Sequence, residues 1–332
     1  MSSFDREPVL DSVRRLHENI RVAVWERLQE ARVASRPELA DRPGDWGAGD
    51  VSYAVDDVAE AALAAFGEDL ARLHPLTLVS EGPGVVPFAG PAGAVPLRAL
   101  IDPIDGTRSL MHDMRSAWVL TGIAVDSGEA TRLSDIEVAM QTELPTTSAA
   151  VYHVLIARKG AGARIERRAV ATGKLLEEGP LQTPAELSLE NGYVSFTRYL
   201  AVERPLVAEL ERSFLEHALT KHELDPRLMY DDQYLCSAGQ LYLVTTGRYR
   251  MLADLRGWLR RTHQLANFTA KPYDLSALLI YREAGAVVLD ETGADLDAPF
   301  DTETALSVVA YPNATLRAAF EPSLRVAMES LR

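Results

Sequence analysis

Helical and β-prone segments alternate along almost the whole chain, and no internal repeat interrupts the alternation. In residues 9–33, Val9, Val13, Leu16 and Ile20 recur at the spacing of one face of an amphipathic helix. Further helices are expected at 56–73, 201–218, 237–247 and 273–285, and strands at 76–81, 97–102, 118–125, 149–157, 192–196, 286–290 and 306–311. This order predicts an α/β or α+β protein made of layered sheets and helices.

A length of 332 residues is large for a single hydrophobic core. No low-complexity linker separates one part of the chain from another. We therefore expect two lobes that share an interface, with the functional site between them. The N-terminal α+β lobe would cover residues 1–180, and the C-terminal α/β lobe would cover residues 181–332.

The chain contains 48 acidic and 34 basic residues, which gives a net charge of −14. This charge repels nucleic acid and anionic membranes, so neither is an expected partner. The single cysteine, Cys236, excludes an intrachain disulfide and a Cys-rich zinc site. The sequence has neither a signal-peptide pattern nor an apolar run of about 20 residues, which a membrane span needs. We expect a cytoplasmic protein.

The sequence LIDPIDGT, residues 100–107, places two carboxylates beside a proline at the end of an expected strand. Pro103 fixes its own φ and restricts Asp102 to extended geometry, so Asp102 and Asp105 are expected on a tight turn. The carbonyl oxygen of Ile104 can point to the same place as the two carboxylates. Hard oxygen ligands grouped in this way suit Mg²⁺, Mn²⁺ or Ca²⁺.

The motif continues with Gly106 and Thr107. Glycine allows backbone angles that other residues avoid, and the exposed N–H groups of a helix that starts at Thr107 would suit a phosphate. Asp-Pro and Asp-Gly are also common turn sequences. The motif alone therefore leaves a simple turn and a metal and phosphate site as alternatives.

LIDPIDGT resembles the signature DP(I/L)DGT of the inositol monophosphatase superfamily, which contains Mg²⁺-dependent, lithium-sensitive phosphatases of small phosphorylated metabolites. Residues 50–56, DVSYAVD, are similar to the family element D-L-V-T-x-x-D. Residues 271–293 are similar to the second signature, W-D-x-A-A-x-x-x-I-x-x-E-A-G-G. Smaller similarities are found at residues 78–81, 157–163 and 308–313. Because the segments follow the family order, a simple turn becomes the less favoured interpretation.

The resemblance implies a layered α-β-α-β-α sandwich like that of inositol monophosphatases and fructose-1,6-bisphosphatases, and a homodimer. It implies ligands for Mg²⁺, or for Mn²⁺ in its place, at Glu81, Asp102, the Ile104 carbonyl, Asp105 and Asp274. Asp56 and Thr107 would activate the attacking water, and Glu81 would also be catalytic. The expected substrate contacts are Asp105, Gly106, Thr107, Ser237 and Asp254.

The activity implied is that of a Mg²⁺-dependent phosphatase, in which a metal-activated water attacks a small phosphorylated metabolite such as an inositol monophosphate. A sugar bisphosphatase and a 3′(2′),5′-bisphosphate nucleotidase of the same superfamily are alternatives. An alternative of another class is a catalytically silent member that binds phosphorylated metabolites or acts as a scaffold. The presence of all four acidic ligand positions favours catalysis.

Two of the chain's departures from the family pattern concern Arg108 and Cys236. Arg108 follows the DGT motif, where it could add a cation to the phosphate site or point into solvent. Cys236 occupies a position that is usually glycine, and the alignment around Ser237 and Ala238 is ambiguous by one residue.

A basic segment, residues 256–263, lies between Asp254 and Asp274. Arg256 and Arg260 are four residues apart and would share one face of a helix. Recognition of a second phosphate is one interpretation of this segment. A solvated basic face is the more common role of such a segment and is the interpretation we favour.

Overall fold

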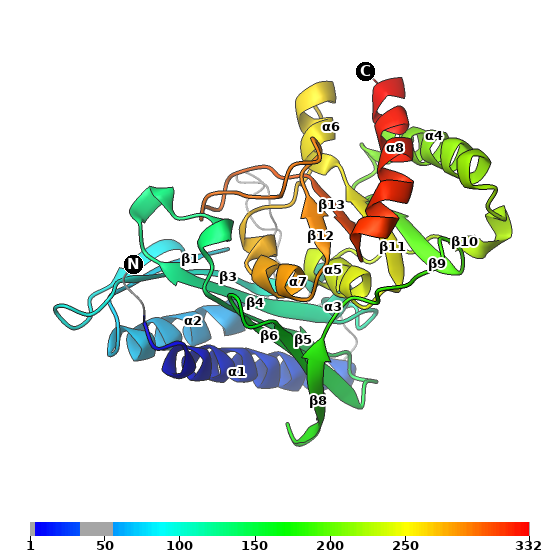
Figure 1. Cartoon of the computed structure of the whole chain (residues 1–332). Coiled ribbons are helices and arrows are strands. Elements are labelled where there is room, and N and C mark those ends of the chain that lie inside the picture. Colours follow the sequence, from blue (N-terminus) through cyan, green and yellow to red (C-terminus); the bar gives the residue numbers. More distant parts are fainter. Residues whose placement is uncertain (1–3, 34–55, 332) are drawn as a thin grey trace.

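The computed structural model describes residues 4–33 and 56–331 and contains two β-sheets with helices around them (Figure 1). The helices are α1 (Arg6–Val33), α2 (Asp56–Ala71), α3 (Thr107–Met111), α4 (Arg204–His222), α5 (Ser237–Thr245), α6 (Arg256–His263), α7 (Leu278–Glu283) and α8 (Ala314–Ser330). None of the described helices is long and apolar enough to cross a lipid bilayer.

The first sheet has eight strands in the order β2-β1-β3-β4-β5-β6-β7-β8. These strands are β1 (Leu76–Ser80), β2 (Gly84–Phe88), β3 (Leu97–Asp105), β4 (Ala117–Val125), β5 (Val138–Leu144), β6 (Val151–Arg158), β7 (Ala163–Ala169) and β8 (Leu175–Leu181). Only β1 and β3 pair in parallel. Every residue of β3 is buried, as expected for a strand that helices cover on both faces.

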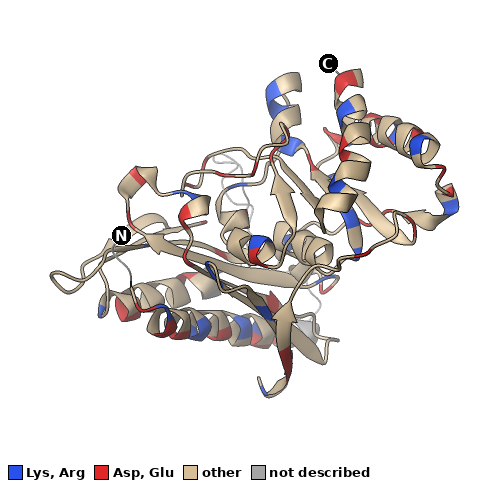
Figure 2. Cartoon of the chain, viewed as in Figure 1, with Lys and Arg blue, Asp and Glu red and all other residues tan. Residues whose placement is uncertain are grey.

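Helices α1 and α2 cover the outer face of this sheet (Figure 1). The apolar stripe predicted from the sequence forms the contact, because Val9, Val13, Leu16 and Ile20 are all at most 2% exposed. The opposite face of α1 carries basic and acidic side chains in alternation (Figure 2). The amphipathic pattern of residues 9–33 therefore places α1 with its apolar side on the sheet.

Helices α5 and α7 lie between the first sheet and the second, and they share one hydrophobic core with both sheets. Gly122 of β4 allows an especially close approach in this layer. A Cβ atom at Gly122 would lie 2.3 Å from the carbonyl oxygen of Ser276. The absence of a side chain at this position therefore lets the turn that contains Asp274 sit directly on β4.

The second sheet has five strands in the order β10-β9-β11-β13-β12. They are β9 (Gly192–Phe196), β10 (Met229–Tyr230), β11 (Tyr249–Asp254), β12 (Val287–Leu289) and β13 (Val308–Tyr311). Helices α4 and α8 cover its outer face, where Phe214 and Phe320 pack with ring centroids 5.7 Å apart. The structure therefore has five layers in the order α-β-α-β-α, and three hydrophobic cores hold them together. The predicted fold class is confirmed.

Candidate active site

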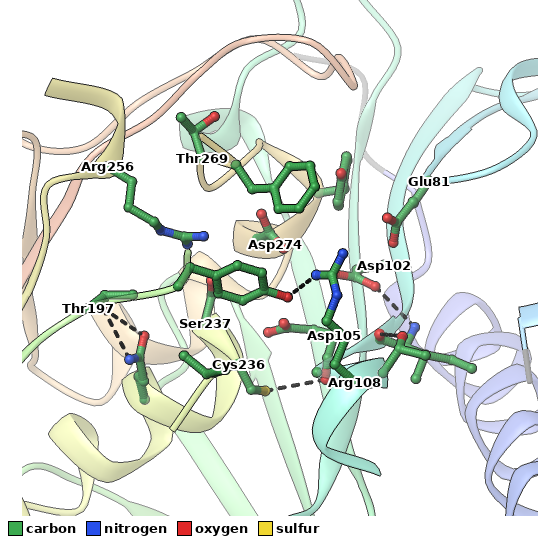
Figure 3. Close-up of a pocket in the computed structure, with 18 residues that line it drawn as sticks. Glu81, Asp102, Asp105, Arg108, Thr197, Cys236, Ser237, Arg256, Thr269 and Asp274 are labelled. Atoms are coloured by element: carbon green, nitrogen blue, oxygen red, sulfur yellow. Dashed lines mark hydrogen bonds between the residues drawn. The ribbon is translucent and has the colours of Figure 1, made fainter. Parts of the chain in front are cut away.

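Three carboxylates from two distant parts of the chain meet at one end of β3. Asp102 and Asp105 belong to β3, and Asp274 belongs to a short 3-10 helix, Tyr273–Leu275. Each of the three offers an oxygen atom, and these atoms all lie within 4.8 Å of one another (Figure 3). Asp102 is only 1% exposed and Asp105 only 8%. The predicted convergence of these acids is therefore present in the structure.

A β-bulge positions the two aspartates of β3. Pairing with β4 is regular up to Asp102, which lies opposite Leu120, and resumes at Asp105, opposite Trp118. Two residues of β3 thus face one residue of β4, as in a bulge. The sequence suggested that the strand ends at Asp102, but it continues to Asp105. The Asp102 carboxylate accepts a hydrogen bond from the Ile104 N–H at 3.0 Å, which stabilises the bulge.

Burial and mutual repulsion disfavour the ionised form of these acids. Burial raises the pKa of Asp102 well above its ordinary value, and the charges of Glu81, Asp105 and Asp274 raise it further. Burial also raises the pKa of Asp105, to about 6, although the Ala238 N–H donates to its carboxylate at 2.6 Å and opposes the shift. A hard divalent cation bound among these carboxylates would favour their ionised form and offset their mutual repulsion.

The donor set fits Mg²⁺ or Mn²⁺ better than a softer metal, because the three clustered groups are carboxylates. Glu81 directly follows β1 and lines the same cavity as the three aspartates. Ile104 lines it as well. The five expected metal ligands therefore all border one cavity of about 90 Å³.

The turn after Asp105 depends on glycine. Gly106 has φ of 97°, in the left-handed region, and a Cβ atom there would lie 2.9 Å from the Cβ atom of Cys236. Thr107 then begins α3, and its hydroxyl donates to the Ile104 carbonyl at 2.8 Å. Gly106 and Thr107 both line the cavity. The expected substrate contacts of the DGT motif therefore face the carboxylate cluster.

The start of α5 is attached to Asp105. The Cys236 thiol donates to the Asp105 carbonyl at 3.3 Å, and its sulfur accepts from the Gly239 N–H at 3.3 Å. Because Ala238 donates its N–H to the Asp105 carboxylate, α5 orients one of the expected metal ligands. Ser237 lines the cavity, as expected of a substrate contact.

Arginine and aromatic side chains also line the cavity (Figure 3). Arg108 donates to the Tyr199 hydroxyl, and its guanidinium carbon lies 5.0 Å from the Tyr199 ring centroid and 5.1 Å from that of Phe268. The guanidinium carbon of Arg256 lies 5.1 Å from the same Tyr199 ring. Arg108 therefore borders the cavity, which decides between the two orientations that the sequence left open.

The basic segment separates into two parts. Arg256 is 7% exposed and lines the cavity, whereas Arg260 and Arg261 are exposed, and Arg261 pairs with Glu291. The solvated basic face therefore describes Arg260 and Arg261 but not Arg256. Asp254 binds Arg256 at 2.6 and 2.8 Å and does not itself line the cavity.

Two other segments named in the sequence analysis are the one that contains Asp56 and residues 157–163. Asp56 begins α2, but its side chain lies outside the part of the chain that the structure describes. The glycine-rich residues 157–163 donate the N–H groups of Gly160 and Gly162 to the Glu283 carboxylate, at 2.8 and 2.7 Å. This loop therefore connects the first sheet to α7.

Some lining residues were not identified from the sequence. They are Thr197, Tyr199, Leu235, Gln240, Phe268 and Thr269. The first two follow the end of β9, and polar residues just after a strand are a recognisable signal for a site. Phe268 and Thr269 lie in a loop that has no such pattern in the sequence.

Comparison with known proteins shows which solved structures share this fold. No protein-family model and no curated protein matches the chain. Among solved structures, the extragenic suppressor protein SuhB from Bartonella henselae matches with a TM-score of 0.65 at 15% identity, covering 96% of this chain and 99% of that one. Fructose-1,6-bisphosphatase from Leishmania major matches with a TM-score of 0.64 at 12% identity, covering 95% and 92%.

Inositol monophosphatase II from Staphylococcus aureus matches with a TM-score of 0.60 at 15% identity, covering 98% of this chain and 96% of that one. The three matches extend over nearly the full length of both chains. The chain therefore has the fold shared by inositol monophosphatase-like and fructose-1,6-bisphosphatase-like structures, which is the fold that the sequence resemblance implied.

Proposed function

We propose that the protein is a Mg²⁺-dependent phosphatase that hydrolyses the phosphomonoester of a small metabolite. The observation that carries this proposal is the convergence of Asp102, Asp105 and Asp274, whose oxygens lie within 4.8 Å of one another in a cavity that also contains two arginines. Buried anions beside cations are the arrangement expected of a site that binds both divalent metal and phosphate.

The residues that would hold the cation are Glu81, Asp102, the Ile104 carbonyl, Asp105 and Asp274. When bound, a divalent cation supplies a Lewis acid at the phosphoryl oxygens and lowers the pKa of water. Mn²⁺ could replace Mg²⁺, because both prefer oxygen ligands.

The protein's own groups perform the remaining tasks. Arg108 and Arg256 border the cavity and would attract an anionic ester, while Gly106 and Ser237 would contact its phosphate. The Thr107 hydroxyl, next to the Ile104 carbonyl, would orient the attacking water and pass its proton towards Asp56. The water oxygen would form a bond to phosphorus as the bond to the ester oxygen breaks, and the leaving oxygen would take a proton from solvent to become an alcohol. We propose that Glu81 assists the activation of the attacking water.

The first candidate substrate is an inositol monophosphate, with a sugar bisphosphate or a 3′(2′),5′-bisphosphate nucleotide as alternatives. A panel of these phosphates, assayed for released inorganic phosphate, distinguishes them. A homodimer is also proposed from the resemblance, and light scattering of the purified protein tests it.

The activity is tested with p-nitrophenyl phosphate, with and without Mg²⁺ and with added lithium, which the resemblance predicts to inhibit. Asp274→Asn should lower kcat by about 100-fold or more, since a catalytic cation contributes several kcal/mol. Asp126→Asn is the control, because Asp126 binds Arg98 just beyond the other end of β4. Cation binding without turnover of any phosphate would instead support the non-catalytic alternative.

A further inference from the structure

A fully buried glutamine interrupts the apolar face that the first sheet turns toward α5 and α7. Gln141 belongs to β5 and has no exposed surface. Its partners across the sheet are Leu120 of β4 and Leu155 of β6, which both belong to the hydrophobic core between the two sheets. Because paired residues point to the same face of a sheet, Gln141 projects into this core, where an apolar side chain is the usual occupant.

The Gln141 side chain connects two helices of this layer. Its amide nitrogen donates to the Ala238 carbonyl, in the first turn of α5, at 3.2 Å. Its amide oxygen accepts a hydrogen bond from the Tyr281 hydroxyl, on α7, at 2.7 Å. Ala238 and Tyr281 are themselves fully buried. The three residues therefore form a buried polar network that attaches both helices to the sheet.

This network reaches the carboxylate cluster through α5. Ala238 donates its own N–H to the Asp105 carboxylate at 2.6 Å. Asp102 pairs with Leu120, and Leu120 pairs with Gln141, so Asp102 and Gln141 lie in one row across three neighbouring strands. Gln141 does not itself line the cavity. It holds the carbonyl group of the same residue whose N–H group holds Asp105.

A polar side chain at this position contributes little to stability by itself. A buried hydrogen bond has a small net effect, because the unfolded chain forms the same bonds with water, and replacing both partners by apolar groups can be nearly neutral. A buried network whose groups are bonded to one another instead holds them in one arrangement. Metal ligands need such support, because their productive geometry tolerates displacements of only about 0.5 Å.

We propose that Gln141 is a positioning residue for the cation site. Through Ala238 it fixes the start of α5 against β3, and thereby the orientation of the Asp105 carboxylate. The inference rests on the proposed function, because it concerns the same cation site. Replacing a residue that orients a metal ligand typically weakens metal binding by about 10- to 100-fold. Gln141 therefore sets the affinity for the divalent cation without contacting cation or substrate.

Mn²⁺ binding to Gln141→Met tests this role. Methionine keeps the length of the side chain and removes both of its hydrogen bonds. Electron paramagnetic resonance of free Mn²⁺ should give a Kd about tenfold higher than that of wild type. In p-nitrophenyl phosphate hydrolysis, the Mg²⁺ concentration for half-maximal activity should rise by a similar factor, whereas kcat at saturating Mg²⁺ should stay close to that of wild type.

Thr142→Val is the matched control. Thr142 is the next residue of β5, is only 2% exposed, and points to the opposite face of the sheet, where its hydroxyl contacts His17 at 2.9 Å. The control removes a buried hydrogen bond of the same strand, so it should lower the Tm and leave the Mn²⁺ affinity unchanged. Equal weakening of Mn²⁺ binding in Thr142→Val and Gln141→Met would refute the proposal, because general destabilisation would then explain both.

A double variant separates positioning from packing. Gln141→Met leaves the buried Tyr281 hydroxyl without its acceptor, and adding Tyr281→Phe removes this unpaired group. Because both partners are then apolar, the double variant should regain most of the Tm lost in Gln141→Met. Its Mn²⁺ affinity should stay low, since the Ala238 carbonyl still lacks its amide donor. Recovery of Mn²⁺ affinity together with Tm would assign Gln141 a packing role and overturn the proposal.

Hydrogen exchange of the cation-free protein separates this inference from the proposed function. In Gln141→Met the Ala238 amide, which binds Asp105, should exchange about tenfold faster relative to the amides of β4, with no such selective change in Thr142→Val. This result would support the positioning role even if wild type binds no Mn²⁺, an outcome that would overturn the proposed function instead. An unchanged Ala238 exchange rate in Gln141→Met would overturn the positioning role even in an active enzyme.

Discussion

Replacing Asp105 with asparagine should make the cation-free protein more stable. The pKa of Asp105 is raised from 3.8 to about 6 by burial, so the folded state binds its proton more tightly than the unfolded state does. The protonated Asp105 side chain stabilises the folded state fully below pH 3.8, and this stabilisation is lost as the pH rises through 6. At pH 7.5 the difference between a pKa of 3.8 and one of about 6 corresponds to about 3 kcal/mol.

This free energy can be converted into a melting temperature. A chain of 332 residues has an unfolding entropy of about 0.7 kcal/mol/K at roughly 2.1 cal/mol/K per residue. Asp105→Asn should therefore raise the Tm of the cation-free protein by about 4 °C at pH 7.5. The asparagine oxygen can still accept the Ala238 N–H, so the hydrogen bond at the start of α5 is retained.

Added Mg²⁺ should reverse the order of the two proteins. At a concentration 1,000 times its Kd, a ligand stabilises the folded state by about 4.1 kcal/mol, which exceeds the about 3 kcal/mol above and which wild type should gain and Asp105→Asn should lose. Differential scanning calorimetry in chelator and in Mg²⁺ measures both effects, with Asp126→Asn as the control. A lower Tm for cation-free Asp105→Asn, together with an unchanged response to Mg²⁺, would refute the reasoning.

Three further predictions concern other parts of the molecule. His17 is fully buried between the Thr121 and Thr142 hydroxyls, and burial lowers its pKa from 6.5 to about 3. Stability should thus fall as the pH drops below 6.5, by about 2 kcal/mol at pH 5, and urea titrations should show a weaker pH dependence in His17→Gln. Gly106→Ala should lose more stability than Gly128→Ala in the same assay, because both glycines have positive φ but only Gly106 faces Cys236. Thr107→Val should lower kcat by about 100-fold at nearly constant Tm, with Thr107→Ser retaining most activity; equal activity of the two variants would exclude a role for the hydroxyl.

Local sequence patterns predicted the layered fold and many of its elements. The strand expected at 192–196 is β9, Gly192–Phe196, and the helix expected at 237–247 contains α5, Ser237–Thr245. Both are apolar segments next to clear breaks, so their structure is decided locally. β7 and β8 were not predicted, because ARIERRA and LLEEGPL lack a regular apolar face and pair through tertiary contacts.

One predicted helix is interrupted in the structure. Residues 273–285 were expected as a single helix, but they form a 3-10 helix, Tyr273–Leu275, and then α7, Leu278–Glu283. The Asp274 carboxylate accepts the Lys271 N–H at 2.6 Å, so it holds its own turn apart from the continuous helix. The interruption aims Asp274 at β3 and is not visible in the apolar periodicity.

The candidate site, like the fold, was predicted from the sequence only in part. Asp102, Asp105 and Gly106 could be identified because their chemistry is encoded within eight consecutive residues, 100–107. The wall formed by Tyr199 and Phe268 joins a segment after β9 to the loop before residue 270, and only the folded chain brings these segments to Arg108. Sequence patterns therefore predicted the carboxylate side of the cavity better than its arginine and aromatic side.

Anomalous diffraction from crystals soaked in Mn²⁺ tests the central claim most directly. We expect a peak within coordination distance of Asp102, Asp105 and Asp274, and its loss in Asp274→Asn crystals. Strong Mn²⁺ peaks elsewhere on the protein, with none among these three carboxylates, would contradict the proposed metal site and the phosphatase mechanism built on it.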